Sequence, residues 1–162
     1  MKIWLGRAMV VVLILVFGGG SVVAYALFKA QERMDRRLQI AAYNVAIPSD
    51  AAALERGKYL FSTRGCVDCH GADGAGRVFV DDGSVRVKGP NISPGPGNVV
   101  ARYTPVDWER ALRHGVKPDG RPLMIMPSED YNRFADDDLA SLVAYVRSLP
   151  PASGQGTVLK LP

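Results

Sequence analysis

The chain has 162 residues and a mass of 17.5 kDa, enough for one ordinary domain with accessory segments and too little for two full hydrophobic cores. Its 20 basic and 16 acidic residues give a net charge of +4. The excess lies before residue 45, where six basic but only two acidic residues fall, so the remainder is neutral. Because a neutral globular part without a basic stripe is a poor match for phosphate backbones, nucleic acid is not an expected partner.

An uncharged apolar stretch lies close to the N-terminus. Residues 8–28 contain no charged side chain, and a helix needs about 20 such residues to span a bilayer. We therefore expect a transmembrane helix over 8–28, preceded by a flank of residues 1–7. A cleaved signal peptide is the alternative, because Lys2 and Arg7 form a positive flank and Ala24–Ala26 fits a cleavage site. The stretch exceeds an ordinary signal-peptide apolar region, which favours the anchor, and both interpretations imply export.

Basic residues also follow the apolar stretch, namely Lys29, Arg33, Arg36 and Arg37. We expect residues 29–48 to form a charged juxtamembrane helix or stalk that contacts membrane lipid. The positive-inside rule, taken alone, places the following part in the cytoplasm. The short N-terminal flank and the site chemistry described below favour the opposite orientation.

Helix signals organise a globular part over 49–151. Ser49 is expected to cap a helix over about 50–63. The Thr104–Asp107 sequence predicts the start of a second helix, with threonine as cap and proline in the first turn, and Gly115 ends it. Three acidic residues, Asp136, Asp137 and Asp138, open a last helix that stops at Pro150-Pro151. Residues 152–162 lack periodicity and are expected to be a tail, mobile or docked on a partner.

A long segment rich in Gly, Pro, Asp and Asn separates the first two of these helices. Within it, Val78–Val80 and Val85–Val87 flank Asp81–Ser84, which predicts a short hairpin. A loop of this length is unusual in a compact domain unless something other than secondary structure holds it. A bound cofactor satisfies that requirement.

Three of the chain's four Cys and His residues fall within Cys66–His70, which reads Cys-Val-Asp-Cys-His. This C-x-x-C-H pattern is the attachment signature of haem c: two thiols add across the porphyrin vinyl groups, and the imidazole of His70 is placed at the iron. A disulfide leaves His70 unexplained. Structural zinc or an iron–sulfur cluster needs further Cys or His ligands at spacings that are absent here. We expect one covalently attached haem c.

The second axial position of the iron needs a separate residue, and Met124, Met126 and His114 are the downstream candidates. Met126 precedes Pro127 in an interhelical loop that can fold over the opposite haem face, so we expect Met126 to be the ligand. Met124, in the same loop, is the nearest alternative. His114 lies beside Gly115 at a helix end, where an imidazole more often interacts with terminal carbonyls. A thioether ligand favours the ferrous state.

Several segments together resemble class I cytochrome c domains: Glu55–Leu60, Cys66–Gly71, Pro90–Ser93, Trp108–Gly115, Asp119–Arg121, Met126-Pro127 and Asp138–Pro150. The similarity covers residues 52–151 and is closer to the cytochrome c subunits of bacterial membrane-bound dehydrogenases. Such subunits often carry three C-x-x-C-H domains, whereas this sequence contains one.

The resemblance implies an all-α, cytochrome c-like haem domain whose first and last helices cross near Gly57 and Tyr145. It also implies His70 as proximal ligand and Met126 as distal ligand. In such domains a proline carbonyl commonly orients the proximal imidazole, and Pro90 is the matching position.

With both axial positions filled by protein, no coordination site is open to substrate, so we expect an electron carrier that is not an enzyme by itself. The interpretation is a monohaem cytochrome c anchored in the bacterial inner membrane with its haem domain facing the periplasm. It would accept electrons from a dehydrogenase subunit and pass them to quinone, a cytochrome or an oxidase. One alternative is a cytochrome c subunit of a terminal oxidase or nitric oxide reductase. Another is a catalytic or ligand-sensing haem protein with a labile methionine ligand.

Overall fold

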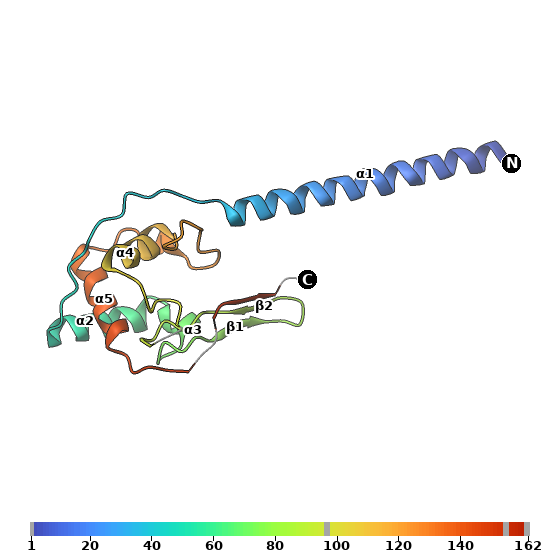
Figure 1. The fold of residues 1–162 in the computed structure, drawn as a ribbon. Coiled ribbons are helices and arrows are strands. Elements are labelled where there is room, and N and C mark those ends of the chain that lie inside the picture. The colour runs from blue at the N-terminus through green and yellow to red at the C-terminus, as the bar shows by residue number, and fades with distance from the viewer. Residues whose placement is uncertain (1, 96–97, 154–155, 161–162) are drawn as a thin grey trace.

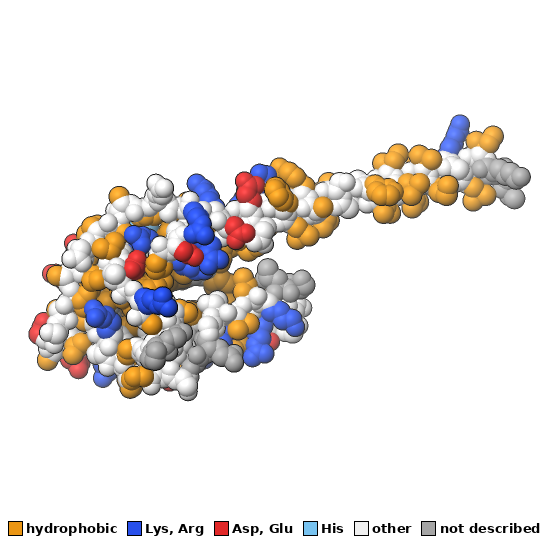
Figure 2. All heavy atoms as spheres, viewed as in Figure 1, with side chains coloured by type: hydrophobic (Ala, Val, Ile, Leu, Met, Phe, Trp, Pro, Cys, Tyr) orange, Lys and Arg blue, Asp and Glu red, His pale blue; other side chains and the backbone are white. Residues whose placement is uncertain are grey.

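The computed structural model describes residues 2–95, 98–153 and 156–160 (Figure 1). Its longest element, α1 (Lys2–Asp35), extends alone away from a body that holds the other elements. None of the apolar window of α1 is buried, and by length and composition this helix can cross a membrane. Apolar side chains cover it along most of its length (Figure 2). A helix is thus present over the predicted span 8–28, and it continues to Asp35.

The segment after α1 packs on the body. The Leu38 N–H donates to the carbonyl oxygen of Gly120 over 2.8 Å, and the Tyr43 hydroxyl donates to Asp136 over 2.8 Å. Val45 is 5% exposed and belongs to the hydrophobic core. The helix or stalk expected over 29–48 is therefore helical only to Asp35, and the remainder is an extended strap held against the body.

Helix α2 (Ala51–Thr63) follows, and α3 (Cys66–His70) comes directly after it. The cap of α2 is Asp50, whose carboxylate accepts from the Ala53 N–H over 3.0 Å, and not Ser49 as predicted. Both residue types cap well, and the extended backbone that lets the side chain reach back falls one position later. Gly65, at a φ of +79°, makes the turn that separates the two helices.

The core lies where α2 crosses α5 (Asp136–Ser148). Gly57 is buried at this crossing, and a β-carbon there would come within 2.7 Å of the Tyr145 β-carbon, which confirms the predicted crossing point. Leu60 and Phe61 of α2 are buried, as are most residues of α5.

Helix α4 (Pro105–His114) begins and ends as predicted. The Thr104 hydroxyl accepts from the Asp107 N–H, while the Asp107 carboxylate accepts from the Thr104 N–H over 2.9 Å. Gly115 ends the helix with a φ of +63°. The short 3-10 helix η1 (Ser128–Asp130) then lies in the loop before α5, directly after the two methionines considered as ligands.

The helical core is supplemented by a small antiparallel sheet with the order β1-β2-β3. β1 (Val78–Asp81) and β2 (Arg86–Lys88) form the predicted hairpin. β3 (Val158–Lys160) comes from the expected tail and pairs with β2, with Leu159 opposite Val87. That part of the tail is therefore docked on its own domain. The fold is dominated by helices, as predicted, and the sheet lies to one side of them (Figure 1).

Candidate haem site

The two cysteines lie on one short helix. α3 places Cys66 and Cys69 three positions apart, so they share a helix face. Both are unbridged and partly buried, and both line the same cavity. Burial raises the pKa of Cys66 to about 11 and also raises the pKa of Cys69. Both residues are therefore protonated thiols at neutral pH, the form that adds S and H across a vinyl group.

The imidazole of His70 is held by Pro90. His70 Nδ1 lies 2.9 Å from the Pro90 carbonyl oxygen. A carbonyl can only accept, so this contact assigns the proton to Nδ1 and leaves the lone pair on Nε2. Burial lowers the pKa of His70, against a smaller opposing effect of the Pro90 hydrogen bond. His70 is therefore neutral at pH 7 with Nε2 ready to bind a metal.

Gly89, which the sequence analysis did not single out, explains how Pro90 comes so close. A β-carbon at Gly89 would lie 2.0 Å from the Cys69 carbonyl oxygen. The Arg77 N–H donates to that same oxygen over 3.0 Å, and the Gly89 N–H donates to Arg77 over 2.9 Å. The residue before the hairpin is thus hydrogen-bonded to α3, and the residue after the hairpin packs against the same carbonyl of α3. In the sequence, this close approach is indicated only by the glycine directly before the proline that orients the imidazole.

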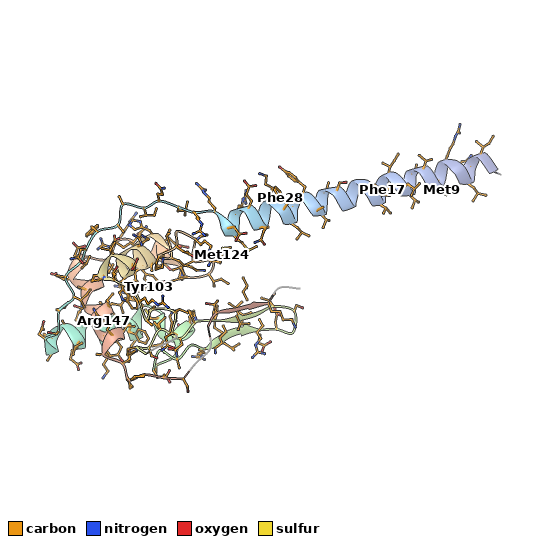
Figure 3. All side chains as sticks on the ribbon, viewed as in Figure 1. Met9, Phe17, Phe28, Tyr103, Met124 and Arg147 are labelled. Carbon is orange, nitrogen blue, oxygen red and sulfur yellow. The ribbon has the colours of Figure 1, made fainter. Side chains whose placement is uncertain are left out.

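An apolar cavity adjoins α3, and its lining comes from helices, from all three strands and from loops. The motif contributes Cys66, Cys69 and His70; the helices contribute Phe61, Trp108, Leu142, Val143 and Val146; the sheet contributes Phe79, Val87 and Leu159; the loop before η1 contributes Leu123, Met124, Ile125 and Met126. Figure 2 shows the body hollowed between the α4 side and the sheet. Met124 and Tyr103, both lining residues, come from the α4 side, across from α3 (Figure 3).

The burial of the two methionines differs. Met126 is partly buried and packs against the hydrophobic core, whereas Met124 is 54% exposed. The hydrogen bond from the Ser128 N–H to the Met126 carbonyl, 2.9 Å long, fixes the backbone beside it. Met126 is therefore the more buried of the two thioethers that line the cavity.

His114 lies away from this cavity. Its Nε2 is 3.3 Å from Oε1 of the buried Glu109, and His114 does not belong to the cavity lining. An imidazole engaged with a buried carboxylate on another side of α4 is not placed to reach a metal beside His70. Of the three candidate ligands, only Met124 and Met126 line the cavity together with His70.

These residues fit a haem. Within the residues that the structure describes, no group of three or more His, Cys, Asp or Glu side chains could hold a metal ion alone. The donors gathered here are instead two thiols, one imidazole and thioethers around an otherwise apolar cavity. That set suits a flat apolar macrocycle which brings its own metal and four nitrogen ligands.

Comparison with known families agrees with this chemistry. The family model described as Cytochrome c matches residues 54–150. The chain belongs to the cytochrome c family, and its cofactor is covalently bound haem c.

Three relatives are cytochrome subunits of bacterial dehydrogenases. The fructose dehydrogenase cytochrome subunit of Gluconobacter japonicus is 33% identical over 126 residues, covering 71% of this chain and 26% of that protein. The alcohol dehydrogenase (quinone) cytochrome c subunit of Gluconacetobacter polyoxogenes is 31% identical over 102 residues, covering 60% and 22%. The gluconate 2-dehydrogenase cytochrome c subunit of Pantoea cypripedii is 32% identical over 99 residues, covering 58% and 22%. The chain spans about a quarter of the length of these relatives.

Proposed function

We propose that Cys66 and Cys69 would hold the haem through two thioether bonds and that His70 and Met126 would bind its iron. The observation that carries this proposal is that all four side chains line one apolar cavity. The Pro90 carbonyl fixes the ring of His70 and, as an acceptor from Nδ1, makes Nε2 a stronger donor to a metal.

Haem c supplies a one-electron ferric–ferrous couple when it is bound. If His70 and Met126 both bound its iron, no coordination site would remain for substrate, so these residues favour electron transfer over catalysis. The Met126 thioether is a softer ligand than imidazole and favours the ferrous form. The aromatic and aliphatic lining limits water access and thereby also raises the potential.

The protein is proposed to serve as the electron-transfer subunit of a membrane-bound dehydrogenase complex, with α1 in the inner membrane and the body in the periplasm. It would accept electrons from the dehydrogenase subunit and deliver them to quinone, a cytochrome or an oxidase. The relatives that are cytochrome subunits of dehydrogenases, together with the length and composition of α1, support this. An anchor keeps the haem close to membrane partners without tight binding.

Two experiments test the proposal separately. Haem staining after denaturing electrophoresis tests the attachment: the wild type should stain, and the Cys66→Ser/Cys69→Ser double variant should not. An unstained wild type, or a staining double variant, overturns the haem site.

The partner is tested by affinity purification of the full chain from native membranes in mild detergent, followed by mass spectrometry. A co-purifying flavin, quinoprotein or molybdenum dehydrogenase supports the proposal. Polytopic oxidase or nitric oxide reductase subunits in the same band would instead place the cytochrome on the input side of a terminal reductase.

A further inference from the structure

The last strand lies outside the cytochrome c match yet lines the haem cavity. The family model ends at residue 150, whereas Thr157 and Leu159 are both cavity-lining residues. In Figure 1 the C-terminal strand runs beside β2, along the edge of the sheet opposite β1. The pocket is therefore completed by a segment that the family pattern does not include.

The register of the sheet explains why Leu159 faces the cavity. Leu159 is paired with Val87, and residues paired across two strands project from the same face of a sheet. Val87 is 5% exposed and lines the cavity, so Leu159 extends the same apolar surface outward by one strand. Leu159 itself is 38% exposed, which places it at the boundary between cavity and solvent. On the other edge Val80 pairs with Val87, and its neighbour Phe79, 36% exposed and beside an irregularity in the β1–β2 register, lines the cavity.

Hydrogen bonds among Asn91, Ser93 and Ala152, here called the clasp, direct the C-terminal segment toward β2. The Asn91 side-chain amide donates to the Ala152 carbonyl over 2.7 Å, and the Ala152 N–H donates to the Ser93 hydroxyl oxygen over 3.0 Å. The Ser93 hydroxyl in turn donates to the Asn91 side-chain oxygen over 2.7 Å. Asn91 and Ser93 are 1% and 0% exposed. The clasp ties the chain just after α5 to the loop that follows β2 and carries Pro90, so the C-terminal segment starts beside the strand that it joins.

We propose that β3 belongs to the haem site. Leu159, which pairs with Val87, would shield the side of the macrocycle that faces the sheet from water. This rests on the haem site proposed above. Oxidation adds a positive charge at the iron, and a charge is disfavoured where water is excluded. Shielding by Leu159 therefore raises the midpoint potential and slows direct electron exchange with small solutes in solution. Electron transfer is thereby restricted to partners that dock on the protein.

The test uses the full-length holoprotein and three variants: Leu159→Ser, Val158→Ser as matched control on the same strand, and a chain lacking residues 157–162. Val158 pairs with Lys88 and is not part of the cavity lining. The deletion leaves the clasp at Ala152 intact. Midpoint potential and the rate of oxidation of the ferrous protein by ferricyanide are measured on each.

Leu159→Ser and the deletion are expected to lower the midpoint potential and to speed oxidation several-fold, while Val158→Ser stays near the wild type. Wild-type values in both Leu159→Ser and the deletion would overturn the inference. Equal shifts in Leu159→Ser and Val158→Ser would also overturn it, because they would report loosening of the strand and not shielding. Loss of haem from the wild type would instead overturn the underlying haem site, so the two failures are distinguishable. If the deletion variant does not fold, the comparison between Leu159→Ser and Val158→Ser is sufficient to decide.

Discussion

A β-carbon at Gly57 would lie 2.0 Å from the backbone carbonyl oxygen of Ser141. Helices α2 and α5 therefore cross with no room for a side chain at this position. The crossing brings the rings of Phe61 and Tyr145 to 5.5 Å between centroids, and Phe61 lines the haem cavity. The close approach of the two backbones is thus coupled to the shape of the site.

Gly57→Ala should destabilise the protein. On helix propensity alone, alanine in place of glycine adds about 1 kcal/mol of stability. Overpacking of a tight contact costs about 1–3 kcal/mol or more, and here backbone atoms cannot move aside as a flexible side chain could. We expect a net loss of about 2 kcal/mol in the free energy of unfolding, measured by chemical denaturation of the holoprotein. Lys58→Ala, exposed on the same helix, is the control and should change little; a stabilised Gly57→Ala variant would contradict the close crossing.

Features governed by neighbouring residues could be predicted from the sequence. The threonine cap and the glycine stop of α4 depend on residues within one helical turn, and the C-x-x-C-H motif is complete within five positions. The predicted cap of α2 is one residue too early, because Ser49 and Asp50 have nearly equal capping preference and only the backbone conformation decides between them.

Features that depend on distant partners could not be predicted from local patterns. β3 is three residues long and acquires its structure by pairing with a strand some seventy positions earlier. The strap after α1 is rich in apolar residues, among them Leu38, Ile40 and Ile47, and their pattern alone does not tell that Val45 becomes buried in the core. The contact between His70 and Pro90 was expected from the family resemblance, whereas the need for Gly89 follows only from the backbone of α3.

Met126→Ala should leave the haem covalently attached and lower the midpoint potential. The thioether bonds do not involve Met126, while its loss removes the ligand that favours the ferrous form. Axial ligation spans about 0.8 V in proteins, and a decrease on the order of 100 mV is expected. Redox titration measures the decrease in potential, and a change from a low-spin to a high-spin absorption spectrum reports the loss of the ligand. Met124→Ala is the matched variant from the same loop and should stay close to the wild type; the opposite result would make Met124 the ligand.

The capping box of α4 should give the fold a component of acid sensitivity. Although partial burial opposes it, hydrogen bonds from Thr104 and the nearby Arg110 guanidinium lower the pKa of Asp107 below its ordinary value of 3.8. A carboxylate with a lowered pKa in the folded state stabilises that state above about pH 4, and the contribution is lost as pH falls through the folded-state pKa. Stability should therefore decrease more steeply on acidification in the wild type than in Asp107→Asn.

Denaturation curves between pH 2 and pH 6 measure this difference. Asp137→Asn, at an exposed first-turn position of α5, is the control and should retain the wild-type slope. Thr104→Ala removes the other half of the box and should cost about 1 kcal/mol at neutral pH. Parallel curves for the wild type and Asp107→Asn would show that the capping carboxylate contributes nothing to the acid dependence.

The strap after α1 should contribute to the stability of the haem domain. Val45→Ala removes two buried methyl groups, worth about 0.8 kcal/mol each by transfer, and leaves a small cavity. A loss of about 2 kcal/mol in the free energy of unfolding is expected. Asn44→Ala, the exposed neighbour, is the control. If residues 36–49 were only a tether, the two variants would unfold alike.

Gly89→Ala should alter the electronic properties of the haem without detaching it. The added methyl group overlaps the Cys69 carbonyl, so the loop after β2, which carries Pro90, must move away from α3. A longer contact between the Pro90 carbonyl and His70 Nδ1 makes the imidazole a weaker donor to the iron. A weaker donor stabilises the ferric state less, so the midpoint potential should rise, in the direction opposite to Met126→Ala.

Gly83→Ala is the matched control. Its φ of +89° strains an alanine, but nothing lies within 4 Å, so this variant should have lower stability and an unchanged potential. A potential that falls in Gly89→Ala would indicate that opening the cavity to water outweighs the loss of the hydrogen bond.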